Sequence, residues 1–149
     1  MPERTVTPSH GSYLLPHLDH ATVADAMHPG ILSCDADATL EDVARMMSTH
    51  HVHSIVVKGA TDDPAGTWKL ISDLDVLQAG MRRDAPDTAA EFALAPVVTV
   101  RTTDPLRDAA ELMLAKSISH VVAVNPETKA AIGILSTLDI AGVLAWGEM

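Results

Sequence analysis

The sequence predicts an α/β fold of the α+β type, built from two tandem copies of a β-α-β-β-α unit that pack as one pseudo-symmetric module. The main observation is an internal repeat. TLEDVARMMSTHHVHSIVV from Thr39 aligns with PLRDAAELMLAKSISHVVA from Pro105, and KLISDLDVL aligns with GILSTLDIA further on. Hydrophobic residues make up 47% of the chain and aromatic residues 3%, which indicates a folded protein with an aliphatic core. Each unit has about 60 residues, too few for a comfortable core of its own, so we expect the copies to pack together.

Each unit is predicted to begin with a short strand and an amphipathic helix. The runs ILSC at 31–34 and VVTV at 97–100 are short, apolar and bounded by Pro, Gly or polar residues. The next helix carries apolar residues at i, i+3, i+4 and i+7, namely Leu40, Val43, Ala44 and Met47 in one copy and Leu106, Ala109, Ala110 and Met113 in the other. Thr39 with Asp42 predicts a capping box, and Asp104-Pro105 predicts a cap followed by proline at the first helical position.

Two further strands and a second helix complete each unit. SIVV at 54–57 and WKLI at 68–71 flank a polar loop, as do HVVAV at 120–124 and AIGIL at 131–135, and both pairs predict a hairpin. A final helix is predicted to begin near Ser72 and near Ser136. The boundaries that follow are an irregular N-terminal segment at 1–20, a first repeat at 21–82 and a second at 83–149, with a polar linker at 80–91.

Charge and composition exclude several classes of protein. The net charge of −10 opposes binding to a nucleic acid backbone or to an anionic membrane surface. The single cysteine, Cys34, has no internal disulfide partner, and neither a signal sequence nor an apolar run of membrane-spanning length is present, so we expect a cytoplasmic protein. The sequence lacks a glycine-rich phosphate loop with lysine, a Gly-x-Ser-x-Gly elbow and a metal-plus-base helix, which argues against an enzyme.

The repeated pattern resembles the CBS domain family, whose members usually occur as a tandem pair called a Bateman module. TVADAMHPGILSCDADATLEDVARMM is similar to the entry of such a domain, and the pattern Gly-apolar-apolar-Ser/Thr-x-x-Asp is complete from Gly133 to Asp139. The resemblance covers residues 21–146. In the first copy Lys69 stands where the family has glycine.

This resemblance implies a regulatory module with no required cofactor, which binds an adenosine-containing ligand between its repeats and signals to an unknown effector protein. The expected ligands are AMP, ADP, ATP, S-adenosylmethionine or NAD, and homodimers are the family's habit. The alternative is a ligand-free module that only mediates dimerisation, and Lys69 favours this alternative for one of the two clefts.

The Ser-x-x-Asp turns at Ser72/Asp75 and Ser136/Asp139 are predicted to be capping boxes first of all. Capping is compatible with binding. A helix start presents N–H groups to an anion, and an ionised carboxylate accepts hydrogen bonds from two ribose hydroxyls. In the family, these serine and aspartate positions contact phosphate and ribose. The matching strand positions for adenine are Ile31, Leu32 and Ser33 in one copy and Val97, Val98 and Thr99 in the other, all of which also suit an ordinary core strand.

Histidines are concentrated after the first amphipathic helix, as His50, His51 and His53. A solvated helix end explains them, because the helix dipole favours histidine there. The nucleotide-binding subunit of AMP-activated kinase carries His or Arg in the corresponding segments, which makes these three residues, with Lys116 and His120 in the second copy, candidates for phosphate contact. In that case anion binding should tighten below neutral pH. A zinc site at His51 and His53 lacks further ligands of evident spacing.

Overall fold

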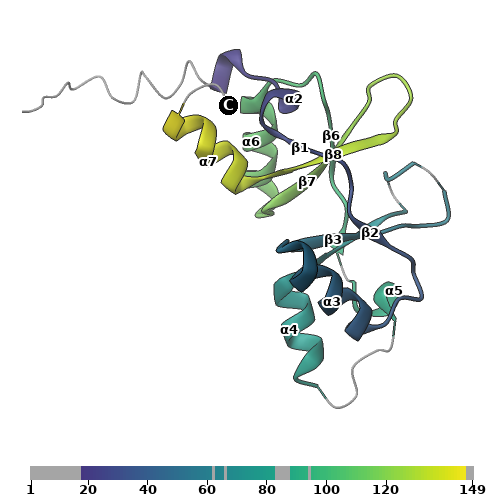
Figure 1. Ribbon diagram of the computed structural model, residues 1–149. Coiled ribbons are helices and arrows are strands. Elements are labelled where there is room, and N and C mark those ends of the chain that lie inside the picture. The colour runs from purple at the N-terminus through teal and green to yellow at the C-terminus, as the bar shows by residue number, and fades with distance from the viewer. Residues whose placement is uncertain (1–17, 62, 66, 83–87, 94, 147–149) are drawn as a thin grey trace, which may run out of the picture.

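The computed structural model describes residues 18–61, 63–65, 67–82, 88–93 and 95–146, which form two α/β bodies, each built around its own sheet (Figure 1). The first repeat contributes α2 (Val23–Ala26), β1 (His28–Pro29), β2 (Ser33–Cys34), α3 (Leu40–His50), β3 (Ser54–Val57), β4 (Lys69–Ser72) and α4 (Asp73–Gly80). The second contributes α5 (Ala89–Phe92), β5 (Ala95–Pro96), β6 (Thr99–Arg101), α6 (Leu106–Lys116), β7 (His120–Val124), β8 (Ala131–Ser136) and α7 (Thr137–Trp146). The predicted tandem β-α-β-β-α order is confirmed.

The two repeats exchange their first strands. One sheet has the order β2-β3-β4-β5, and the other has the order β1-β8-β7-β6. Strand β1 therefore leaves the first repeat to pair with β8, while β5 leaves the second repeat to pair with β4, and both pairings are antiparallel. The short helix before each exchanged strand also packs on the other repeat. Val23 and Ala26 of α2 lie in the second repeat's core, and Ala89 of α5 lies in the first repeat's core.

A third cluster of buried residues joins the two sheets. It contains side chains from both repeats, namely Val56, Trp68, Val97, Val122 and Val124, with Ile31, Leu70, Ala131 and Ile134 packed against them. Burial of this apolar surface stabilises the pair as a unit, because it returns to water if the repeats separate. The predicted packing of two small units into one module is therefore what the structure has.

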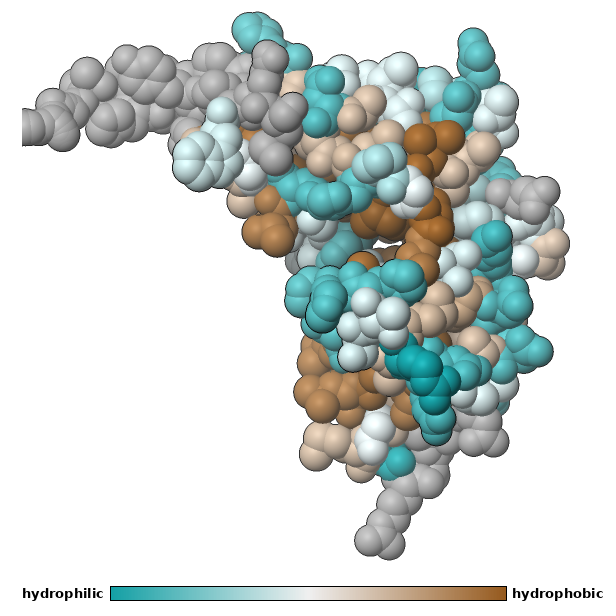
Figure 2. Space-filling model, in the orientation of Figure 1, coloured by the Kyte–Doolittle hydropathy of each residue, from teal (hydrophilic) through white to brown (hydrophobic). Residues whose placement is uncertain are grey.

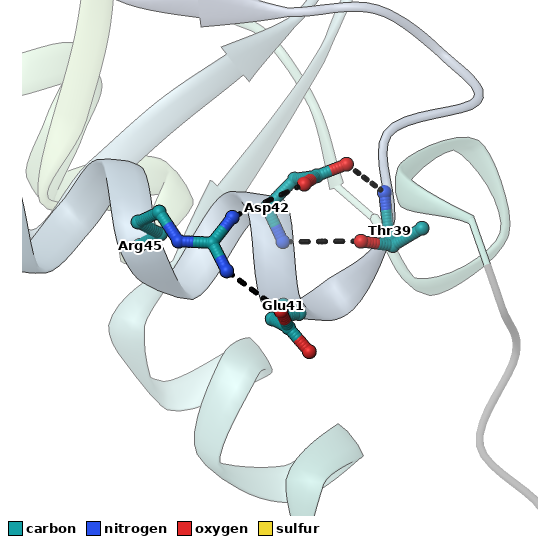
Figure 3. A network of polar contacts seen from close by, with 4 residues as sticks. All are labelled: Thr39, Glu41, Asp42 and Arg45. Carbon is teal, nitrogen blue, oxygen red and sulfur yellow. Dashed lines mark hydrogen bonds and ion pairs between the residues drawn. The ribbon is translucent and has the colours of Figure 1, made fainter.

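A capping box fixes the residue at which α3 begins (Figure 3). The Thr39 hydroxyl accepts a hydrogen bond from the Asp42 N–H at 3.1 Å, and the Asp42 carboxylate accepts from the Thr39 N–H at 3.1 Å. The backbone N–H of Thr39, acting on the Asp42 carboxylate, is the main reason that the pKa of Asp42 lies below its usual value. Arg45 pairs with Glu41 one turn along the same exposed face. The predicted capping box is confirmed.

The second long helix begins differently from the prediction. Pro105 is the cap residue of α6 and provides no side-chain bond, while Asp104 accepts from the Arg101 N–H at 2.9 Å and pairs with the Arg101 guanidinium. The predicted Asp104 cap is therefore wrong, because the carboxylate closes the turn before the helix instead of capping its first N–H groups.

Two segments that we predicted to be irregular contain short helices. Residues 18–20 are helical, with Leu18 packed on the second repeat's core and Asp19 paired with Arg107, whereas residues 1–17 lie outside the described part of the chain. The predicted linker at 80–91 ends in α5, since Ala89 is buried in the first repeat's core and its N–H bonds to the Ala38 carbonyl at 2.7 Å. Packing against the other repeat orders both segments.

The exchanged strand β1 passes so close to Gly133 that this position has no room for a side chain. A Cβ at Gly133 would lie 2.3 Å from the His28 carbonyl oxygen and 3.1 Å from the Met27 sulfur, so any larger residue must push β1 away from β8. Gly133→Ala should lower the free energy of unfolding by roughly 1–3 kcal/mol, the usual cost of overpacking, as measured by urea denaturation.

Gly80→Ala is the matched control, because a Cβ there meets nothing within 4 Å and alanine favours a helix more than glycine does. We expect it to leave stability unchanged or to raise it by up to about 1 kcal/mol. Equal stabilities of the two variants would contradict the close approach of β1 to β8.

Candidate functional site

Both Ser-x-x-Asp turns are capping boxes. Ser72 Oγ accepts from the Asp75 N–H at 3.1 Å, and the Asp75 carboxylate accepts from the Ser72 N–H at 2.9 Å. Ser136 and Asp139 repeat the arrangement at 3.1 and 2.8 Å. In each turn one carboxylate oxygen, Oδ2, is used by the cap, which leaves Oδ1 for another partner. The first role predicted for these residues, helix capping, is confirmed.

The second oxygen of Asp139 faces a histidine that the sequence analysis did not consider. His28 Nε2 lies 2.7 Å from Asp139 Oδ1, with the Asp139 side chain 9% exposed and that of His28 79% exposed. His28 reaches this place because β1 pairs with β8, which sets His28 opposite Ile134. Sequence reasoning missed it because the contact depends on the strand exchange; the only local signal was a histidine beside the Pro-Gly that ends the strand.

The first repeat carries a different polar set around its turn. His53 Nδ1 lies 3.0 Å from Asp73 Oδ2, and this hydrogen bond is the main reason that the pKa of Asp73 lies below its usual value. The Asp73 N–H also bonds to the His53 carbonyl at 2.9 Å, which ties the start of α4 to the start of β3. Lys69, in the place of Gly133, extends to the Ala90 carbonyl at 3.2 Å and so helps to hold α5 on the first repeat.

Side chains from the two repeats come within electrostatic range of each other at the starts of β3, β7, α4 and α7. Figure 1 shows these four starts on one side of the paired sheets, with the two hairpin loops on the other side. Burial lowers the pKa of the half-buried His120, and the charge of His53 lowers it further, while the carboxylates of Asp139 and Asp73 oppose the shift. His120 also lies opposite Ser136 across the strand pair. We call His28, His53, Asp73, His120 and Asp139 the boundary group.

The remaining candidates lie elsewhere. His50 and His51 are exposed at the C-terminal end of α3, where His51 has a left-handed backbone, and Lys116 is exposed at the corresponding end of α6. Leu32 packs against the first repeat's core and Val98 against the second's, and each gives its carbonyl to a neighbouring strand. Ser33 and Thr99 are half-buried in β2 and β6.

A cavity of about 300 Å³ lies between the repeats on the side of the hairpin loops. Its walls are Asp63 and Ala65 from the first repeat and Thr99, Val100, Arg101, Asp104, Val124 and Lys129 from the second. Thr99 alone among the predicted site residues lines it, and neither Ser-x-x-Asp turn reaches it. This cavity and the predicted chemistry are therefore at different places.

The described residues contain no group of three or more His, Cys, Asp or Glu side chains that could hold a metal ion. Cys34 is buried, and burial, with the nearby carboxylates of Asp35 and Asp42, raises the pKa of its thiol to about 11. Within the described part of the chain, no helix has both the length and the apolar character needed to cross a bilayer.

The fold and the two repeated turns are those of a CBS pair. The model of the CBS domain family matches residues 23–82 and 89–145, and the chain belongs to this family. No curated protein matches the sequence.

Solved CBS structures share the fold at low sequence identity. The CBS domain of a bacterial CNNM/CorC family Mg²⁺ transporter in complex with ATP is 17% identical, with a TM-score of 0.76, over 95% of this chain and 98% of that one. The CBS domain pair of protein MJ0100 with 5′-methylthioadenosine and S-adenosylmethionine is 18% identical, with a TM-score of 0.73, over 84% and 96%. Hypoxic Response Protein I with two zinc ions is 21% identical, with a TM-score of 0.64, over 82% and 98%.

The lowered pKa of His120 predicts how stability responds to pH. The unfolded chain takes up a proton near pH 6.5 more readily than the folded chain, so stability should fall as the pH drops below this value. His120→Gln should reduce the slope by up to about 1.4 kcal/mol per pH unit, the limit for one proton. Urea denaturation at pH 5, 6, 7 and 8 measures it.

His20→Gln, at an exposed histidine outside the boundary group, serves as the control and should keep the wild-type slope. His53→Gln should give an intermediate slope, because the charge of His53 is one cause of the low pKa of His120. A His120→Gln slope equal to that of the wild type would contradict the assignment.

Proposed function

We propose that this protein is a regulatory module that binds an adenosine-containing ligand beside Asp139 and passes the binding state to a protein partner. The observation that carries the proposal is the Asp139 carboxylate. It is fixed by a capping box, is 9% exposed and stands at the start of a ten-residue helix, within electrostatic range of His120, which also senses His53 and Asp73 of the other repeat. A carboxylate in open solvent would not select a ligand, whereas one held at the boundary of two repeats meets it in a defined geometry.

The chemistry of the turn suits the two polar parts of such a ligand. Asp139 Oδ1 is the oxygen not used by the cap, and a carboxylate oxygen accepts strong hydrogen bonds from ribose hydroxyls. The first N–H groups of α7 and the Ser136 hydroxyl are placed for an anion such as phosphate. His120 and His53 add positive charge when they are protonated, and we place adenine against the strand segments around Leu32 and Val98.

The solved relatives support the class of ligand. ATP occupies the CBS domain of the transporter, and methylthioadenosine with S-adenosylmethionine occupies the pair from MJ0100. The common part of these molecules is an adenosine with an intact ribose diol, which is the part that a single carboxylate recognises. We therefore name AMP, ADP, ATP, S-adenosylmethionine and NAD as candidate ligands and adenosine as their shared core.

A ligand-free role is the second candidate for the first repeat's cleft. Lys69 replaces the glycine, and its ammonium group donates a hydrogen bond to the Ala90 carbonyl. The first repeat's cleft thus has a side chain with a structural role at the position where the other cleft has Gly133. Under this alternative the cleft at Asp75 only supports assembly, and the cleft at Asp139 carries the binding. The absence of catalytic motifs fits regulation better than catalysis in either case.

We further propose that the protein is a homodimer through α4. Leu74, Leu77 and Met81 lie at i, i+3 and i+7 on and just after this helix, and all three are exposed. Figure 2 shows apolar surface along this side of the first repeat. Three large apolar side chains on one helix face favour burial by another protein surface, and a second copy supplies the same face.

Thermal melting tests the ligand proposal. AMP, ATP, S-adenosylmethionine or NADH at 100 times its dissociation constant should raise the midpoint by on the order of 5–10 °C, because it binds the native state alone. Asp139→Ala should abolish the increase, while Asp75→Ala should keep most of it. No increase with any of the four at millimolar concentration would favour the ligand-free alternative.

Light scattering tests the dimer. The wild type should have twice the mass of one chain, and Leu77→Glu should have the mass of one chain, because a carboxylate on the buried face has no partner. Lys116→Glu changes the charge at an exposed position on another helix and should leave the mass unchanged. A Leu77→Glu variant that remains dimeric would place the interface elsewhere.

A further inference from the structure

His28 occupies the oxygen of Asp139 that the proposed ligand needs. Its Nε2 lies 2.7 Å from Asp139 Oδ1, while Oδ2 already accepts from the Ser136 N–H at 2.8 Å. A ribose diol that bonds to Oδ1 therefore has to displace the imidazole. The His28 side chain is 79% exposed, so it has room to swing into solvent without disturbing the core.

The corresponding place in the first repeat has no histidine. Pro29 lies opposite Gly133 and His28 opposite Ile134, whereas Pro96 lies opposite Lys69 and Ala95 opposite Leu70. Ala95 thus stands where His28 stands, and its methyl group cannot bond to a carboxylate. Among the described residues no side chain forms a hydrogen bond or ion pair with Asp75 Oδ1, whereas His28 pairs with Asp139 Oδ1.

We propose that His28 is a latch on the Asp139 cleft, which lowers the affinity of an adenosine ligand because it competes with the ribose hydroxyls for Asp139 Oδ1. This inference rests on the proposed function. Every ligand that bonds to Oδ1 has to displace the imidazole and is weakened by the same factor, whereas a ligand that does not reach Oδ1 is unaffected.

The latch is stronger when the imidazole is charged, because a charge-assisted hydrogen bond exceeds a neutral one. Other groups also face Asp139: the Ser136 N–H on its own turn, and His120 from β7, with His53 and Asp73 behind it from the first repeat. The two further histidines attract a phosphate when they are charged and thus oppose the latch. Adenosine has no phosphate, so its affinity reports the effect of His28 alone.

The test is a titration of the full chain with adenosine, followed by the backbone amide resonances of Asp139 and Asp75 in ¹H–¹⁵N NMR spectra. At pH 6, His28→Ala should bind adenosine at Asp139 roughly two- to five-fold more tightly than the wild type, the worth of one exposed ion pair. His28→Gln should bind adenosine with an affinity between those of the wild type and His28→Ala, because its amide NH₂ can still donate a hydrogen bond to Oδ1. Both variants should melt like the wild type.

Two control variants sharpen the result. His20→Ala removes an exposed histidine outside the boundary group and should leave adenosine affinity unchanged. Ala95→His places an imidazole in the equivalent position of the first repeat, where it should weaken any adenosine-induced shift of the Asp75 amide and leave that of Asp139 as it was.

The outcomes separate the latch from the proposed function. Unchanged or weaker adenosine binding by His28→Ala, with binding still lost in Asp139→Ala, overturns the latch and leaves the proposed function standing. Tighter AMP binding by the wild type than by His28→Ala, with equal adenosine binding, makes His28 a phosphate contact and also overturns the latch. If neither the wild type nor His28→Ala binds adenosine, AMP, ATP, S-adenosylmethionine or NADH at millimolar concentration, the proposed function falls and the latch falls with it.

Discussion

The surroundings of both candidate clefts depend on the exchange of the leading strands between the two repeats. The pairing of β1 with β8 brings His28 to Asp139 and requires the bare backbone of Gly133, which the His28 carbonyl approaches closely. The pairing of β5 with β4 carries α5 onto the first repeat, where Ala89 completes the core and Lys69 reaches the Ala90 carbonyl. The same topology thus builds a tightly packed, glycine-dependent edge on one side and a lysine-bridged edge on the other.

The two Ser-x-x-Asp turns show how a structural motif gains chemistry from its surroundings. As capping boxes they are equivalent, with the same four atoms at nearly the same distances. Their second oxygens differ, because one meets an imidazole from the exchanged strand and the other does not. The chain as a whole carries a charge of −10, which repels anions at long range. Under the proposed function, the helix starts and the histidines at the boundary supply the local positive potential that a phosphate requires.

The sequence predicted most of the fold, because the internal repeat and the apolar periodicity are local signals. Strand β3 and the capping box at Thr39 lie where the pattern indicated. The parts that it did not predict depend on contacts distant in sequence. Helix α5 reads as a polar linker until Ala89 is known to lie in the other repeat's core, and His28 is an ordinary histidine until β1 is paired with β8. Asp104 failed as a predicted cap because a nearby Arg101 N–H competes for its carboxylate.

The shared cluster around Val56, Trp68 and Val122 has one more consequence. Each sheet contains a strand from the other repeat, and both sheets bury side chains in that cluster. If one repeat unfolds, the remaining repeat therefore exposes an unpaired sheet edge and the apolar side chains of the cluster. The chain should therefore melt as one cooperative unit, and occupancy of a single cleft protects amide hydrogens in both halves from solvent exchange. A measurement of overall stability therefore detects that a ligand is bound, and only a measurement on individual residues shows which cleft it occupies.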